Sequence, residues 1–438
     1  MNKDRIIWLD CLRIVACFAV IFAHTASQTF ITRDPSSLGW NICNCYDAMC
    51  YWANYAFYML AGIFFLDPEK EIPTSKLYKK YIKKLALVFI FWFFLNNLFF
   101  YWFDGKYLVS NTTSTFLREM TLHMAKHLWF LLAIIGFYVS VPIIRCITRN
   151  KDILPYFLFV GVLWYFVHFV ASSIAQPLSL KLISRLASPL LHNMIAPCFS
   201  FVLGYYLAKC IEKIDVKTEF AWYLLGIAGY LSIVFATAYF SCKEGKTVLK
   251  YFSESVLATA VAVFVFFKCR VAKINFSAQA KKAIQFLSSH MLGVYLLHLG
   301  CLSMVDRYVL PLKSFNLLFS IPLVALVTFL ISLAIFILYL VTGSKGSSAT
   351  LLTPGFGSWD IPIIKDIPIL GTMAHSLVCD ADSEYEAFLD YAKSNPYNCV
   401  FLVDTYDTLR SGVVNAIKVF NYMKENNHRN TAIIKMDN

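Results

Sequence analysis

Ten apolar runs separated by polar connections occupy the first 342 residues of the chain. A helix needs roughly 20 apolar residues to cross a bilayer core about 30 Å thick, and most of the runs approach that length. The pattern predicts an all-α polytopic membrane protein with about ten transmembrane helices. The runs cover residues 6–26, 51–66, 85–103, 128–147, 153–171, 189–208, 220–240, 251–267, 284–305 and 318–341.

The composition indicates that most of the protein's surface faces lipid. Hydrophobic residues make up 58% of the chain, only 15% of residues are charged, and the mean hydropathy is +0.59. A soluble domain carries charge at about a quarter of its positions. The formal net charge of +12 is spread over short clusters between apolar runs. We therefore expect a bilayer as partner and no nucleic acid.

Lys and Arg in the connections set the predicted orientation, because cytoplasmic loops are enriched in them. They are more numerous in the N-terminal segment and after the second, fourth, sixth and eighth runs than in the other connections. This bias places both termini in the cytoplasm and predicts a multi-pass protein of the cell (inner, cytoplasmic) membrane. The longest outer loops are then residues 27–50 and 104–127. The three cysteines of the first loop are expected to be free thiols, with a disulfide as the alternative.

The first run contains ionisable residues, which are costly at membrane depth and usually functional. Arg13 and His24 are 11 residues apart, so they project from one helical face about 16 Å apart along the axis. Asp10 is close enough to pair with Arg13. A cation in the inner leaflet suits a phosphate-bearing donor, and a histidine further out suits a general base. The alternative is that Arg13 snorkels to the headgroups and His24 only completes an interfacial hydrogen bond.

The Arg–ten residues–His arrangement resembles the first helix of the acyltransferase-3 family, whose members are ten-helix membrane proteins. Several later segments resemble the family in the same order, although residues 51–62 lack the usual Pro and have Ala61 where a Ser precedes the Gly. The resemblance covers residues 1–342. The other segments are the Lys-rich loop 76–84 with Trp92, His-Leu-Trp-Phe-Leu at 127–131 with Tyr138 and Pro142, Phe-Val-Leu-Gly-Tyr-Tyr at 201–206, and Ser-Ser-His-Met-Leu-Gly-Val-Tyr-Leu-Leu-His at 288–298.

The resemblance implies an O-acyltransferase that uses cytosolic acyl-coenzyme A, usually acetyl-CoA, as its donor substrate. The acceptor would be a hydroxyl of an extracytoplasmic glycan or lipid-linked sugar, as in polysaccharide O-acetylation. Arg13 would contact the donor phosphates, and His24 would be the catalytic base or an acyl relay. No bound cofactor and no metal site are expected, since no Cys or His spacing indicates zinc. A glycan-precursor transporter or flippase without acyl transfer is the alternative function.

Four further residues are candidates for substrate binding. His127 and Trp129 open the fourth predicted helix on its outer side and would line the acceptor site, although Trp129 could equally be an interfacial anchor. Tyr295 and His298 are three residues apart on one helical face and would point to the same cavity. The alternative for His298 is a hydrogen bond to a neighbouring backbone group.

The segment after Thr342 has a different character. Residues 343–350 are typical of a linker, and residues 351–438 are predicted to form a short soluble α/β segment. Its predicted elements are helices near 383–393 and 411–425 and a strand at 400–403. Residues 365–420 resemble nicotinate phosphoribosyltransferase. His375 would take the place of that family's functional histidine, and Asp404 and Asp407 lie near the end of a predicted strand.

This segment is too short for phosphoribosyltransferase activity, because a parallel barrel cannot close from one or two βα units. The simplest interpretation is a fusion that appends an incomplete enzyme to the membrane domain, and a nicotinate-sensing module is the alternative. The sequence does not identify the acceptor, the acyl group or the oligomeric state.

Overall fold

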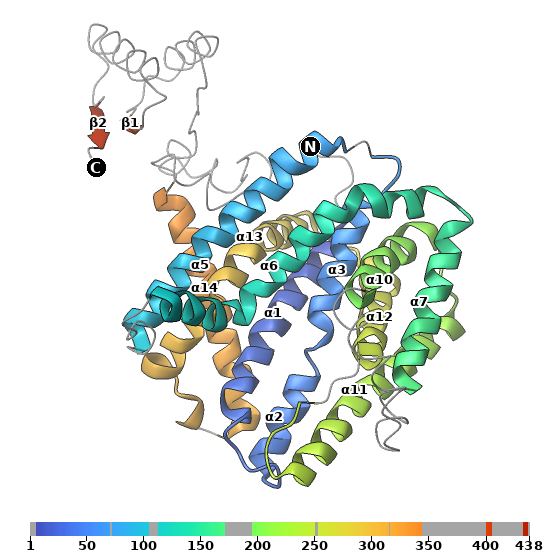
Figure 1. Cartoon of the computed structure of the whole chain (residues 1–438), viewed down its shortest axis with the longest axis horizontal. Coiled ribbons are helices and arrows are strands. Elements are labelled where there is room, and N and C mark those ends of the chain that lie inside the picture. The colour runs from blue at the N-terminus through green and yellow to red at the C-terminus, as the bar shows by residue number, and fades with distance from the viewer. Residues whose placement is uncertain are drawn as a thin grey trace, which may run out of the picture. The chain divides into compact units, whose positions relative to one another are not determined.

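The computed structural model describes residues 6–70, 72–104, 113–170, 195–249, 253–314, 316–343, 400–404 and 432–436. The chain divides into two compact units, Met1–Ala334 and Ile335–Asn438. The first unit is built from helices (Figure 1). In chain order they are α1 (Ile7–Phe30), α2 (Leu38–Ala48), α3 (Trp52–Phe65), α4 (Thr74–Lys76), α5 (Lys83–Asp104), α6 (Thr113–Arg149), α7 (Ile153–Val170), α10 (Ile195–Tyr205), α11 (Val216–Glu244), α12 (Ser253–Cys269), α13 (Ala278–Met304) and α14 (Leu317–Gly343), which runs into the second unit.

Short tighter or wider turns extend several of these helices. They are the π-helical turns η1 (Leu77–Ile82), η3 (Tyr206–Cys210) and η5 (Val305–Val309), and the 3₁₀ turns η4 (Val271–Lys273) and η6 (Leu312–Ser314).

Six helices in the described ranges are long and apolar enough to cross a membrane, so the chain is a multi-pass membrane protein. Each of the ten apolar runs overlaps a helix of the structure, but some are shorter, such as the apolar stretches at 153–167 and 198–210. The count of ten spans therefore stays a prediction. The six are Ile7–Phe30, His127–Arg149, Val216–Glu244, Glu254–Lys273, Ala278–Val309 and Leu317–Leu338.

The two predicted outer loops contain helix that the apolar pattern did not indicate. Residues 27–50 were expected to be a loop, but α1 continues to Phe30 and α2 follows. The Ser37 side chain caps α2 by accepting a hydrogen bond from the Trp40 amide. The buried residues of α2 recur at helical spacing, but polar side chains among them interrupt the apolar pattern.

The second loop was expected at 104–127, but α6 begins at Thr113. The added part is rich in polar and charged residues, so it does not stand out as an apolar run. With 37 residues α6 is longer than a bilayer core of about 30 Å requires.

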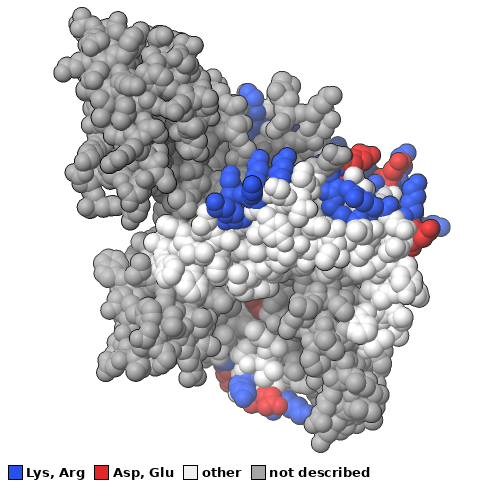
Figure 2. Space-filling model, turned by 45° about the horizontal axis from the view of Figure 1, so that its top comes forward, with Lys and Arg blue, Asp and Glu red and all other residues white. Residues whose placement is uncertain are grey.

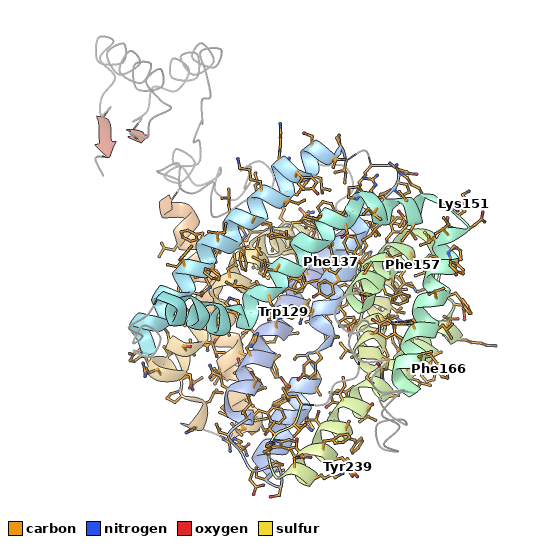
Figure 3. The ribbon with its side chains drawn as sticks, in the orientation of Figure 1. Trp129, Phe137, Lys151, Phe157, Phe166 and Tyr239 are labelled. Atoms are coloured by element: carbon orange, nitrogen blue, oxygen red, sulfur yellow. The ribbon has the colours of Figure 1, made fainter. Side chains whose placement is uncertain are left out.

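The outward faces of the helices are apolar. Tyr156 and Phe166 on α7 are 68% and 62% exposed, and Tyr239 on α11 is 65% exposed. Figure 3 shows Phe166 and Tyr239 on the outer helices α7 and α11, whereas Phe137 lies between α6 and its neighbours. In Figure 2, Lys and Arg gather along one edge of an uncharged band, and a smaller charged group lies at the opposite edge. This distribution suits a lipid-facing belt between two aqueous ends.

The connections predicted to be cytoplasmic contact one another at one end of the helices. Arg145 donates hydrogen bonds to the backbone carbonyls of Asp67 and Lys70, and Lys209 lies 3.3 Å from the Asp67 carboxylate. The further contacts at this end join Lys268 to the carbonyls of Leu207 and Ile211, and Arg270 to Glu219.

The predicted outer segments meet at the other end. The Trp40 indole donates to the Thr247 hydroxyl at 2.9 Å, and the Thr247 hydroxyl donates to the Phe30 carbonyl. Tyr46 donates to the Leu318 carbonyl at 2.9 Å. The alternation of ends inferred from Lys and Arg therefore agrees with the contacts, while the cytoplasmic assignment itself stays a prediction.

Helices α3 and α10 cross at very close range because glycines remove side chains from the contact. A Cβ atom on Gly62 would lie 1.8 Å from the Phe201 carbonyl oxygen, and one on Gly204 would lie 2.3 Å from the Met59 backbone. The crossing fixes α3, whose Tyr58 ring stacks on Phe130 of α6 while its Phe57 ring meets Phe130 at a tilt.

In the second unit the structure describes the end of α14 and two strands. β1 (Val400–Asp404) covers the strand predicted at residues 400–403 and pairs in parallel with β2 (Ala432–Met436). Val400 faces Ala432, and Asp404 faces Met436. The helices predicted near 383–393 and 411–425 lie outside the described residues.

Candidate functional site

The candidate site lies along the contact between α1 and α13. The Arg13 guanidinium donates to the Ser288 hydroxyl, and the Cys17 thiol lies 3.5 Å from the Met291 carbonyl oxygen. These contacts join residues 275 and 274 positions apart in the chain, and His24 packs against His298 at almost the same separation. A constant separation means that the two helices run parallel. Both therefore carry polar groups from one end of the domain toward the other.

Arg13 is held in place near the end predicted to be cytoplasmic. Its guanidinium lies 3.5 Å from the Asp10 carboxylate and donates to the Ser288 hydroxyl at 3.0 Å. Ser288 in turn donates to Asp10 at 2.6 Å, so the three side chains form a closed network. The Arg13 side chain keeps 24% of its surface exposed, against 5% for Asp10. A fixed, accessible cation of this kind suits an anionic ligand.

Further along the same contact, histidines from three helices converge. The ring of His24 on α1 lies 5.2 Å from that of His298 on α13, centre to centre. The ring of His127 on α6 lies 5.3 Å from His298, nearly perpendicular to it. His127 and His298 are buried, whereas His24 is partly exposed. His24 is thus the member of this cluster that a substrate can reach first.

Backbone hydrogen bonds fix the inner part of the cluster. The Nδ1 atom of His298 donates to the Tyr295 carbonyl one turn earlier on α13. The Tyr295 hydroxyl donates to the His127 carbonyl, which ties α13 to α6. Since Nδ1 of His298 carries the proton, its Nε2 is left with the lone pair.

Two buried imidazole nitrogens remain without a partner among the residues that the structure describes. They are Nε2 of His127 and Nε2 of His298. A buried polar atom without a hydrogen-bond partner costs about 1–3 kcal/mol of stability. Such atoms are therefore uncommon unless a ligand or a water molecule binds them. The described residues contain no group of three His, Cys, Asp or Glu side chains placed to hold a metal ion. The unpaired Nε2 atoms suit the cluster to hydrogen-bond acceptance and proton transfer.

The structure separates the four predicted substrate-binding residues. The rings of His127, Tyr295 and His298 lie 5.3–5.8 Å from one another, and His298 also contacts the His24 ring. That Tyr295 and His298 line a common cavity stays a prediction. The backbone hydrogen bond of the alternative interpretation is present, because Nδ1 of His298 bonds the Tyr295 carbonyl. The substrate-binding role of His298 stays a prediction. Trp129, labelled in Figure 3, is 44% exposed and contacts Phe130 instead of the histidines. That position suits the interfacial anchor, and its acceptor role stays a prediction.

Sequence reasoning missed two neighbours of Arg13. Ser288 was quoted only as part of a motif, and Phe64 was not singled out, although its ring centre lies 5.6 Å from the Arg13 guanidinium. One signal could have found Ser288. It precedes His298 by nearly the interval that separates Arg13 from His24, as expected for two parallel helices with matching polar levels.

The residues singled out in the C-terminal segment have little structural context. Asp404 is the last residue of β1, at a strand end as expected. His375 and Asp407 lie outside the described residues, so their roles stay predictions.

Comparison with known proteins gives two unrelated similarities. An acyltransferase domain model, Acyl_transf_3, matches residues 6–340. The C-terminal segment is 59% identical over 54 residues to nicotinate phosphoribosyltransferase of Bacillus subtilis, which is 12% of this chain and 11% of that protein. It is also 43% identical over 77 residues to nicotinate phosphoribosyltransferase pncB2 of Mycobacterium tuberculosis, 18% of this chain and 14% of that protein.

The chain thus spans only a small part of the curated relatives that it matches. No solved structure matches it.

Proposed function

The chain belongs to the acyltransferase domain family Acyl_transf_3 through residues 6–340, and from this we propose that it is an O-acyltransferase of the cell membrane. The donor is cytosolic acyl-coenzyme A, most simply acetyl-CoA, and the acceptor is a hydroxyl of an extracytoplasmic glycan or lipid-linked sugar. The observation that carries the proposal concerns the partly exposed His24, which is on the same helix as the fixed cation of Arg13. The His24 ring packs against the buried His298, which in turn packs against the buried His127.

Arg13 supports binding of the donor from the cytoplasmic end. Asp10 and Ser288 hold its guanidinium, which is planar and well matched to phosphate oxygens. The long pantetheine arm would then extend along the α1–α13 contact toward His24, about 16 Å further along the helix axis. This places the thioester near the histidines while the nucleotide stays at the aqueous end.

In the simplest route His24 acts as a general base. The acceptor hydroxyl gives its proton to a ring nitrogen of His24, and its oxygen attacks the thioester carbonyl carbon. The carbon–sulfur bond breaks as the new carbon–oxygen bond forms, and coenzyme A leaves as a thiol once the proton returns to its sulfur. The Nε2 atoms of His127 and His298 can accept further hydrogen bonds from sugar hydroxyls and so orient the acceptor.

A relay route uses the same residues in two steps. A His24 ring nitrogen attacks the thioester first, coenzyme A thiol leaves, and the acyl-imidazole then passes its acyl group to the acceptor hydroxyl. Brief incubation with labelled acetyl-CoA in the absence of acceptor separates the routes. Label bound covalently to His24 indicates the relay, and no covalent label indicates the base.

The function is tested in membranes that contain the protein, supplied with labelled acetyl-CoA and followed by mass analysis of the surface glycans. We expect a glycan to gain the acyl mass, and the His24→Ala variant to lose this activity while it remains in the membrane. Because general base catalysis typically accelerates a reaction 10²–10⁴-fold, we expect the rate of acyl transfer to fall by about that factor in His24→Ala.

Full activity of His24→Ala would exclude the mechanism. Movement of a glycan precursor without consumption of acetyl-CoA would instead identify the transporter or flippase alternative. Phe166→Leu serves as a control, because it changes an exposed aromatic residue on the outer helix α7, outside the histidine cluster.

A further inference from the structure

A second cation, Lys70 in the turn that follows α3, contacts the same aromatic ring as Arg13. The guanidinium carbon of Arg13 is 5.6 Å from the centre of the Phe64 ring, and the Lys70 ammonium is 5.8 Å from the same centre. Cations at this distance are attracted to an aromatic ring. The two positive groups therefore share one aromatic side chain at the end predicted to be cytoplasmic.

This group is exposed at the surface of the helical unit. Phe64 is 40% exposed, although its neighbours Ile63 and Phe65 are buried, and the Lys70 side chain is 50% exposed. A large exposed aromatic residue that contacts two cations, in the last turn of an apolar helix, is well placed to meet a ligand at this end of the protein.

Hydrogen bonds from α6 fix the backbone around Lys70. Arg145 on α6 donates to the carbonyls of Asp67 and Lys70, and the Thr148 hydroxyl donates to the Leu66 carbonyl at 2.9 Å. The Asp67 carboxylate lies 3.9 Å from the Lys70 ammonium and 3.3 Å from that of Lys209. The turn thus presents a cation at a defined position without burying it.

Carboxylates also lie in this region, so net charge alone does not define the ligand. Asp10 pairs with Arg13, Asp67 is shared by two lysines, and Glu69 is exposed on the same turn. A ligand that uses both Arg13 and Lys70 must therefore place negative groups at two separate points. A nucleotide with a diphosphate and a further phosphate does so.

We propose that Phe64 and Lys70 form, with Arg13, the nucleotide subsite for the acyl donor. Lys70 binds a phosphate of acyl-coenzyme A, and Phe64 positions the two cations and packs against the nucleotide. The subsite gives donors that carry the nucleotide a lower KM than donors that lack it. This inference rests on the proposed function. The test uses two donors, so that failure of the subsite can be told apart from failure of the proposed function.

The experiment compares acetyl-CoA with acetyl-pantetheine, which carries the same thioester without the nucleotide phosphates. For Lys70→Gln in the full-length protein we expect KM for acetyl-CoA to rise about fivefold with kcat unchanged, as for loss of a partly exposed charge pair. KM for acetyl-pantetheine should not change. Phe64→Leu should behave similarly, and Lys70→Arg should restore the wild-type KM for acetyl-CoA.

Lys76→Gln is the matched control, since it removes one exposed Lys from the same connection. An equal effect of Lys70→Gln on both donors, or no effect on acetyl-CoA, overturns the subsite. If wild-type protein turns over neither donor, the proposed function fails. Equilibrium binding of labelled coenzyme A to wild type and Lys70→Gln then tests the subsite alone, and equal affinity overturns it.

A lipid phosphate is the other source of the same chemistry. The measurements are therefore made in nanodiscs of phosphatidylcholine and, separately, in nanodiscs that also contain phosphatidylglycerol. An effect of Lys70→Gln that persists in phosphatidylcholine supports the donor subsite. An effect seen only with the anionic lipid identifies a headgroup site instead and overturns the proposal.

Discussion

The imidazole rings of His24 and His298 lie 5.2 Å apart, although the first belongs to α1 and the second to α13. The contact brings a partly exposed histidine against a fully buried one whose Nδ1 is already bonded to a backbone carbonyl. His298 can therefore influence His24 only through its ring face or its unpaired Nε2. This directional arrangement leads to the first prediction.

His298→Ala should reduce kcat/KM for acyl transfer by about 10²-fold, because it removes the Nε2 acceptor beside His24. His298→Asn keeps a donor for the Tyr295 carbonyl but lacks the second ring nitrogen, so it should preserve folding better without restoring activity. The decisive measurement is the double variant. If the histidines act as a unit, His24→Ala combined with His298→Ala loses little more than His24→Ala alone. Additive losses would show that His298 acts only on structure.

Ser288→Ala should weaken donor binding with a smaller effect on kcat. The Ser288 hydroxyl accepts from Arg13 and donates to Asp10, so its loss frees the guanidinium to move and leaves a buried carboxylate with one donor fewer. We expect KM for acetyl-CoA to rise several-fold and stability to fall by about 1 kcal/mol. Ser289→Ala is the control, because that hydroxyl donates to the Phe286 carbonyl on its own helix. Equal KM changes in the two variants would refute a role for the network.

Gly62→Ala should destabilise the helical unit strongly. The new methyl group would lie 1.8 Å from the Phe201 carbonyl oxygen, so α3 and α10 would have to separate. We expect a loss of at least about 3 kcal/mol, in the range of severe overpacking. Gly136→Ala on α6 has no atom within 4 Å of the added Cβ and should be neutral or slightly stabilising. Thermal unfolding in detergent compares them, and similar midpoints would contradict the close crossing.

Asp47 on α2 predicts a pH dependence of stability. Burial raises the pKa of its carboxyl to about 6 from an ordinary value of 3.8, and the hydrogen bond from Tyr51 offsets part of this effect. Because the folded state holds the proton more tightly, stability is greatest below about pH 4 and falls as pH rises through about 6. The loss from this group is roughly 3 kcal/mol, at about 1.4 kcal/mol for each pH unit between the two values.

Asp47→Asn should remove this fall between pH 4 and pH 7. The exposed Asp34 offers a control of opposite sign, since hydrogen bonds from Ser36 lower the pKa of its carboxyl. Unfolding curves measured across this pH range for the two Asn variants decide the matter. An unchanged pH profile in Asp47→Asn would show that another group is responsible.

Sequence patterns predicted the helical class and much of the candidate site. A chain that crosses a bilayer must do so as long apolar helices, so each apolar run indicated a helix. Helical periodicity then placed Arg13 and His24 on one face of the first helix. The pattern failed where helices are polar. Both α2 and the start of α6 lie in predicted loops, because a search for apolar runs cannot register them.

Partners between helices could not be predicted from the runs themselves. Local spacing paired Asp10 with Arg13 and Tyr295 with His298, but it carried no information on which helices touch. That α13 lies beside α1, and that Phe64 reaches Arg13 from α3, depends on tertiary packing such as the glycine crossing of α3 and α10. The open Nε2 atoms of His127 and His298 are likewise a property of the packed state.

The parallel pairing of α1 with α13 has a consequence for biogenesis. A ribosome delivers α1 to the membrane first, and more than 250 further residues must follow before Ser288 and His298 emerge. Until then Arg13 lacks its hydroxyl partner and His24 its imidazole neighbour, so no partly inserted chain can carry the complete site. Completion of insertion thus becomes the event that switches the enzyme on, and premature termination yields inert protein instead of uncontrolled acyl transfer.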